Sequence, residues 1–285
     1  MKKITLFIFY CMTIQSFAAA LPQSNAEYCA RFGVRQQDQE IIQDLSTEPE
    51  NLMSFRNDGG IFNGGVCWWH SRFQRNIFYL SLFRPDLEKP KSIQELQLII
   101  HQIRLGSSVV IIPGYANLAE FTTENQKLIQ NELNDWQLYD GVVLGGWIDG
   151  LKGHSSVAVS EMQKMMSELF DYVSVKKKIA YEKLQIKGIT SHAWLVVGIK
   201  KMPSGFDIGF IDSNKPQMSQ VYSYKIDDQS FFTKSYGNFV PYLEFKREEQ
   251  RVLDAGKVFC GIKSSFTSDS NAQADYELDL KEAAL

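Results

Sequence analysis

The pattern of apolar and polar positions divides the chain into a helical part and a strand-rich part. An apolar stripe with helical steps of three or four residues runs along Val66, Trp69, Phe73, Ile77 and Leu80. This stripe predicts a helix that ends before Pro85. Similar spacing predicts further helices over 36–46, 92–105, 122–138 and 156–182, with Gly106 as a C-cap and a short buried strand at 109–112.

After residue 183 the apolar pattern changes from a helical to a strand-like period. The predicted strands cover 184–188, 192–200, 205–212, 219–226, 239–246 and 257–263. Helices that precede strands, rather than alternate with them, are typical of the α+β class. We therefore expect one domain over 21–263, with a helical N-terminal part at about 36–182 packed on an antiparallel sheet at about 183–263.

The two ends of the chain have compositions of their own. Lys2 and Lys3, an apolar run over 4–14 and three alanines at 18–20 are typical of a secretory signal cleaved after Ala20, with an uncleaved anchor as the alternative. The signal predicts a secreted or periplasmic protein. No other apolar run approaches the length of a membrane span. The tail over 264–285 is rich in acidic residues, and we expect it to be disordered.

Charge and short motifs exclude several classes of function. With 33 acidic and 30 basic side chains, the formal net charge is −3, which argues against nucleic acid as a partner. The sequence contains no HExxH motif, paired CxxC motif, calcium loop, P-loop or GxGxxG motif. We therefore expect no metal site and no cofactor.

Cysteine usage changes once the signal is removed. Four cysteines are present, and loss of 1–20 removes Cys11, which leaves Cys29, Cys67 and Cys260. An odd number in an oxidising compartment leaves one thiol unpaired. Three pairings are open, and the pair Cys29–Cys260 would tie the two ends of the domain together and leave Cys67 free.

Cys67 follows the glycine-rich segment Gly64-Gly65-Val66 and lies in the first turn of a predicted helix. Amide groups and the positive end of the dipole at a helix N-terminus favour a thiolate, and free N–H groups there can bind an oxyanion. A buried structural cysteine is the alternative. Four of the five tryptophans, those at 68, 69, 147 and 194, would line a cleft or, more commonly, pack in a core.

A predicted hairpin supplies a partner for this thiol. Folding the chain about residue 202, at the start of the turn Met202-Pro203-Ser204-Gly205, places His192 opposite Asp212, on one face, with Asn214 on the same face. A one-residue slip would separate the side chains. The alternatives are a core histidine and an ordinary turn-forming aspartate. The remaining histidines are weaker candidates: His70 lies three residues after Cys67, while His101 and His154 suit packing or surface roles.

A cysteine at a helix start followed by Trp, a later strand that opens with His-Ala, and a hairpin that ends in Asp or Asn together resemble the papain-like cysteine peptidase superfamily. The aspartate looks more like bacterial double-glycine-leader and related peptidases than papain. The resemblance covers 60–75 and 188–216. It implies a papain-like fold with Cys67 as nucleophile, His192 as base and Asp212 as the residue that orients the base, with Asn214 as a substitute.

One position departs from the family pattern. The family commonly has Gln six residues before the cysteine, where it donates to the oxyanion, and here that residue is Ile61. Asn63 would supply an amide instead. The sequence thus predicts an exported thiol hydrolase, a cysteine peptidase acting on peptide or protein substrates. The alternatives are an inactive papain-like binding module, and a cell-wall peptide amidase or acyl transferase that uses the same residues.

Overall fold

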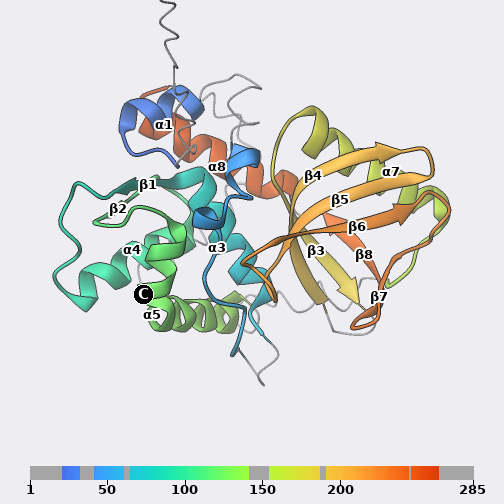
Figure 1. Cartoon of the computed structure of the whole chain (residues 1–285), viewed down its shortest axis with the longest axis horizontal. Coiled ribbons are helices and arrows are strands. Elements are labelled where there is room, and N and C mark those ends of the chain that lie inside the picture. Colours follow the sequence, from blue (N-terminus) through green and yellow to red (C-terminus); the bar gives the residue numbers. More distant parts are fainter. Residues whose placement is uncertain are drawn as a thin grey trace, which may run out of the picture.

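The computed structural model describes residues 21–32, 42–60, 65–140, 154–186, 191–243 and 245–262. Two halves lie side by side in it, one mainly helical and one mainly antiparallel sheet, which makes the fold α+β as predicted (Figure 1). The expected signal at 1–20 and the expected disordered tail at 264–285 lie outside these residues. Among the described helices, none combines the length and apolar character needed to cross a membrane.

The helical half is built around α3, which runs from Cys67 to Leu80. Helix α4 (Ile93–Leu105) begins at Ser92, whose side chain accepts from the Glu95 N–H, and ends at Gly106 with a φ of 61°, as predicted. The other helices of this half are α5 (Leu118–Leu138), α1 (Asn25–Phe32) and α8 (Phe245–Phe259). Strands β1 (Ser81–Arg84) and β2 (Val110–Pro113) form a small parallel sheet.

The second half is a six-stranded antiparallel sheet in the order β6-β5-β4-β3-β8-β7. Its edge strands approach each other, because the Phe232 N–H on β7 donates to the Tyr222 hydroxyl on β6 over 2.8 Å. The strand bounds are β3 Ala180–Ile186, β4 Ser191–Met202, β5 Gly205–Asp212, β6 Ser219–Lys225, β7 Phe231–Thr233 and β8 Gly237–Leu243.

Two predicted elements are wrong. The helix expected over 156–182 is α7 (Val159–Phe170) with a π-helical turn at Asp171–Val175, and β3 begins at Ala180. Because β3 is buried along its whole length, its sequence lacks the alternation that marks a half-exposed strand. The strand expected over 257–263 overlaps helix α8 instead. There Val252 and Ala255 point into the core while Val258 is exposed, which is a helical pattern.

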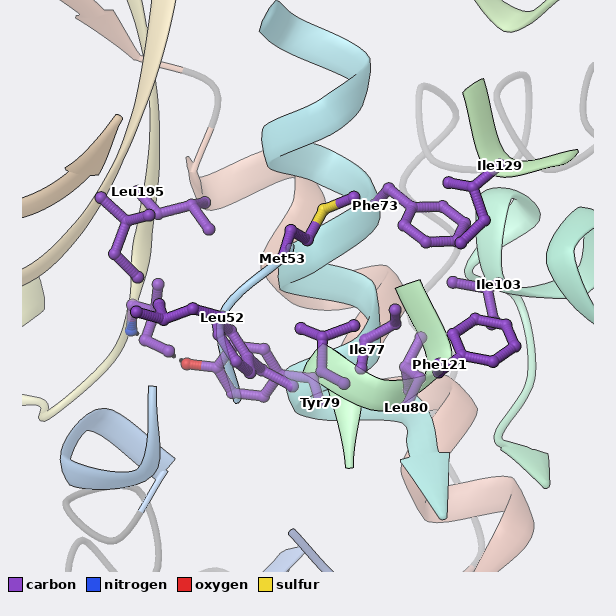
Figure 2. Close-up of a cluster of buried hydrophobic side chains, with 14 of the residues drawn as sticks. Leu52, Met53, Phe73, Ile77, Tyr79, Leu80, Ile103, Phe121, Ile129 and Leu195 are labelled. Carbon is purple, nitrogen blue, oxygen red and sulfur yellow. Dashed lines mark hydrogen bonds between the residues drawn. The ribbon is translucent and has the colours of Figure 1, made fainter. Parts of the chain in front are cut away.

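Helix α3 joins the two halves through its apolar stripe. Figure 2 shows Phe73 and Ile77 of α3 between Leu195 of β4 on one side and the helical half on the other. The buried residues that meet this stripe include Leu52, Met53, Ile103, Phe121, Ile129 and Leu195. The sheet therefore packs directly on the helix that begins with Cys67.

Cys29 of α1 and Cys260, which follows α8, form a disulfide across a sequence separation of 231 residues. The predicted pairing is therefore confirmed. Cys67 is the free cysteine of the part of the chain that the structure describes.

Among the residues that the structure describes, the interior of the sheet half contains a carboxyl group without a hydrogen-bond partner. Glu182 of β3 is buried, and neither of its carboxylate oxygens has a hydrogen-bond partner. It shares its face of β3 with Ala180, Leu184 and Ile186, which belong to an apolar cluster. Burial raises the pKa of Glu182 well above its usual value, so the folded protein favours the protonated form.

Replacement of Glu182 by Gln will stabilise the protein increasingly as the pH rises. The raised pKa means that unfolding releases a proton from Glu182. In the wild type, Glu182 therefore favours the folded state fully below about pH 4.5, and this contribution to stability is lost as the pH rises toward the pKa of the folded state. The difference in the free energy of unfolding should grow by up to about 1.4 kcal/mol per pH unit. Urea titrations of both proteins between pH 4.5 and 8 measure this difference. A difference that does not change with pH would contradict a protonated Glu182 in the folded protein.

Candidate active site

Cys67 occupies the first position of α3 and is partly exposed. Val66 caps the helix without a side-chain hydrogen bond, so no side chain of the cap satisfies the N–H groups of the first turn. Gly65 has a φ of 84°, and a Cβ atom there would lie 2.4 Å from Oδ1 of Asn57. Glycine is therefore required at this point for both backbone conformation and space.

Strand β4 carries the expected base, and its pairing with β5 contains a β-bulge. Met202 pairs with Gly205 across the predicted turn, and this register continues to Gly198 opposite Gly209. Val196 then pairs with Phe210, so Val197 is an extra residue on β4. Beyond the bulge, Trp194 lies opposite Asp212.

The predicted pairing of His192 directly opposite Asp212 is thus wrong by two residues, because the chain folds between Pro203 and Ser204 rather than at residue 202, and because Val197 adds one residue to β4. An error of two residues still leaves His192 on the same face of the sheet as Asp212, because side chains alternate between the faces with a period of two. Without the bulge, the register of the turn would place Leu195 opposite Asp212, and His192 would lie on the other face. Instead His192 and Asp212 are diagonal neighbours, within reach of their side chains.

The structure brings Cys67, His192 and Asp212 together. Nε2 of His192 lies 2.7 Å from Oδ1 of Asp212. Cys67 is close enough to the imidazole to contribute to the shift of its pKa. Sγ of Cys67 lies 3.8 Å from the carbonyl oxygen of Ser191, and the Trp68 indole donates to the carbonyl oxygen of His192 over 3.0 Å. The first turn of α3 is therefore docked on the start of β4.

The charges in this group reinforce each other. Burial alone would lower the pKa of His192, but the hydrogen bond to Asp212 and the nearby Cys67 outweigh burial and raise it above the usual value. Burial would likewise raise the pKa of Asp212, but the bond to His192 lowers it. The backbone N–H of Asn214 also donates to Oδ1 of Asp212 over 2.8 Å. These contacts make His192 a stronger base than a free imidazole, held by the carboxylate beside the thiol.

Asn214 has a different position from the one expected of a substitute for Asp212. Its side chain bonds Asn57 and Tyr236, with the Asn57 amide donating to Oδ1 over 2.6 Å. The Asn57 amide also lies 2.8 Å from the Ser213 hydroxyl. Asp212 is therefore the group that orients His192, while Asn214 ties the end of the hairpin to the segment that precedes Cys67.

A stripe of amide side chains on α5 holds that segment from the other side. Gln130, Asn134 and Gln137 are spaced at i, i+4 and i+7, which places them on one face of the helix. Gln130 donates to the Asp58 carbonyl over 2.6 Å, and Oδ1 of Asn134 accepts from the Gly60 N–H over 3.0 Å. Gln137 donates to the Gly65 carbonyl over 2.9 Å. These bonds fix the backbone that leads to Cys67.

The other histidines have separate environments. His70 is fully buried, its Nε2 lies 2.9 Å from the Phe55 carbonyl, and burial lowers its pKa to about 4, which makes it a neutral packing residue. His101 bonds Glu132, and His154 is exposed. Within the described ranges, no group of three or more His, Cys, Asp or Glu side chains is arranged to hold a metal ion.

Several expected residues have other outcomes. Asn63, Ile61 and Trp147 lie outside the described residues, so the amide expected to donate to an oxyanion stays a prediction. Trp68, Trp69 and Trp194 are buried and pack in the core. The sequence reading missed Tyr236, Asn57 and the α5 amides. Asn57 and Tyr236 lie in turn-forming stretches that give no helical or strand period. The spacing of the α5 amides can be seen in the sequence, but nothing there shows that they bond the backbone that precedes Cys67.

Comparison of the chain with protein-family models, with curated proteins and with solved structures finds no significant match.

Proposed function

We propose that the protein is a cysteine hydrolase of the papain-like type that cleaves amide bonds in peptides or proteins. The observation that supports this most strongly is the contact series from the Cys67 thiol through the His192 imidazole to the Asp212 carboxylate. A nucleophile, a base within hydrogen-bond reach and a third group that orients the base are the parts that nucleophilic catalysis requires. Their placement on a helix start and an antiparallel sheet agrees with the resemblance found in the sequence.

The chemistry follows from the positions of these groups. His192 takes the proton of Cys67, and the thiolate attacks the carbonyl carbon of the amide. The first N–H groups of α3 are available to bind the oxyanion that forms. The imidazolium then gives its proton to the leaving amine as the C–N bond breaks, which leaves a thioester on Cys67. Water activated by His192 releases the acid product and restores the thiol.

The compartment is part of the same proposal. The disulfide between Cys29 and Cys260 is of a kind that persists in oxidising environments. Together with the signal expected at 1–20, it supports export from the cytoplasm. Cys67 would then be kept free because its thiol is needed for the reaction.

Hydrolysis can be tested in water labelled with the heavy oxygen isotope. A mixture of synthetic peptides of varied sequence is incubated with the wild-type protein and with the Cys67→Ser variant, and products are identified by mass spectrometry. We expect new carboxyl termini that carry one heavy oxygen in the wild-type sample and none above background with Cys67→Ser. Equal cleavage by both proteins would contradict a role for the thiol. New peptide bonds without heavy oxygen would indicate acyl transfer instead.

A further inference from the structure

A tyrosine outside the predicted site packs against the base. Tyr236 lies in the turn between β7 and β8, is partly buried and places its ring centroid 5.0 Å from that of His192, with an angle of 32° between the ring planes. The neighbouring contact of Tyr236 is an edge-on one with Phe239 at 6.2 Å. The Tyr236 ring therefore covers one face of the imidazole.

The position of this ring is fixed by a chain of hydrogen bonds. The Asn214 amide donates to the Tyr236 hydroxyl, and the Asn57 amide donates to Oδ1 of Asn214 over 2.6 Å. The backbone of Asn57 is itself bound to the Ser213 carbonyl over 2.9 Å. The chain thus connects the β7–β8 turn, the end of β5 and the segment that leads to Cys67. These are the elements that surround the nucleophile and base.

The groups that face His192 favour its charged form. Asp212 of β5 bonds His192, Tyr236 of the β7–β8 turn packs on it, and Cys67 and the buried, neutral His70 of α3 lie within electrostatic range of it. Burial and the proximity of Asp212 and Cys67 raise the pKa of Tyr236, so the ring stays uncharged. The face of a neutral aromatic ring within about 6 Å attracts a cation.

We propose that Tyr236 is a positioning residue that holds the His192 imidazole in its charged form beside Cys67, with Asn214 and Asn57 fixing the tyrosine. This inference rests on the proposed function, because it assigns the tyrosine to the same thiol–imidazole pair. Tyr236 acts through His192, and no contact with substrate is required.

The test measures alkylation of Cys67 by iodoacetate between pH 4 and 11. The thiolate attacks the methylene carbon, the carbon–iodine bond breaks and iodide leaves. Because iodoacetate is an anion, the imidazolium accelerates its reaction, and the alkaline decline of the rate reports loss of the imidazolium proton. Mass spectrometry of the peptide that carries Cys67 gives the rate in the full chain.

The variants separate the ring from its hydroxyl. Tyr236→Leu removes both, and we expect the alkaline decline to move down by about one pH unit. Tyr236→Phe keeps the ring and loses the bond to Asn214, and we expect a smaller downward shift. Phe232→Leu is the matched control, because Phe232 lies on the adjacent strand β7 and is 58% exposed, and its profile should equal that of the wild type. Thermal melts check that each variant is folded. If Tyr236→Leu does not fold, the profile of Tyr236→Phe is compared with that of the wild type instead.

The possible results distinguish the two proposals. A wild-type rate that only rises with pH, as for an ordinary thiol, would overturn the proposed function itself. A wild-type profile with an alkaline decline that stays in place in both folded Tyr236 variants would overturn only the role of Tyr236. A decline that moves equally in Phe232→Leu would also overturn it, because the shift would then not depend on contact with His192.

Discussion

Replacement of Asp212 by alanine will lower the rate of the proposed hydrolysis by about 10²-fold or more, without unfolding the protein. General acid–base catalysis by a positioned side chain contributes about 10²–10⁴-fold. In the variant, Nε2 of His192 loses the acceptor that now lies 2.7 Å away, while the imidazole stays buried. Burial then lowers the pKa of His192 without compensation from the carboxylate, and the thiolate–imidazolium pair is lost.

The matched variant for this prediction is Asp212→Asn. Its amide oxygen can still accept from Nε2 and from the Asn214 N–H, so orientation is kept while the charge is removed. We expect it to retain activity within about tenfold of the wild type, well above the alanine variant, because an acceptor without charge still holds the ring. Initial rates of peptide cleavage near pH 6 measure both variants. Similar rates for Asp212→Ala and the wild type would show that the carboxylate does not serve the base.

Removal of the disulfide will lower the free energy of unfolding by about 2–5 kcal/mol. The bridge closes a loop across 231 residues, so its loss increases the freedom of the unfolded chain. It also joins α1 to the end of α8, where the rings of Tyr28 and Phe259 pack 5.2 Å apart and the Tyr28 hydroxyl donates to the Tyr79 carbonyl of α3 over 2.7 Å. Both terminal helices are therefore held against α3 by this connection.

Urea titration of the double variant Cys29→Ser/Cys260→Ser measures this loss. Cys67→Ser is the control, since it removes a sulfur and leaves the bridge intact, and its midpoint should stay close to that of the wild type. A double variant with an unchanged midpoint would mean that the packing of α1 and α8 holds the ends of the fold without the bridge.

The sequence predicted the parts of the fold that have a regular period. The helix that starts at Cys67, the helix that ends at Gly106, and the hairpin turn at 202–205 are confirmed. The strand expected at 184–188 overlaps β3, but the first residues of β3 were assigned to the preceding helix, because β3 is buried on both faces and shows no alternation. The strand expected at 257–263 was wrong, since Val258 and Ile262 are exposed residues at and beyond the end of a helix rather than a buried run.

The site was predictable in its residues and not in its geometry. Cys67, His192 and Asp212 were found from their local settings, but the register that brings the last two together depends on the extra residue Val197. A bulge leaves no clear mark in the apolar pattern of a strand that is largely buried. Tyr236 was not predictable either, because its contact with His192 crosses 44 positions of sequence and joins the start of β4 to the β7–β8 turn.

The most direct test of the proposed activity is covalent labelling by a peptide that carries a thiol-reactive electrophile. The wild-type protein, Cys67→Ala and His192→Ala are labelled side by side, and mass spectrometry locates and quantifies the adduct. The thiol–imidazole pair predicts labelling of the wild type at Cys67, none of Cys67→Ala at that position, and labelling of His192→Ala slower by about 10²-fold. Equal labelling of the wild type and His192→Ala would contradict activation of Cys67 by the imidazole.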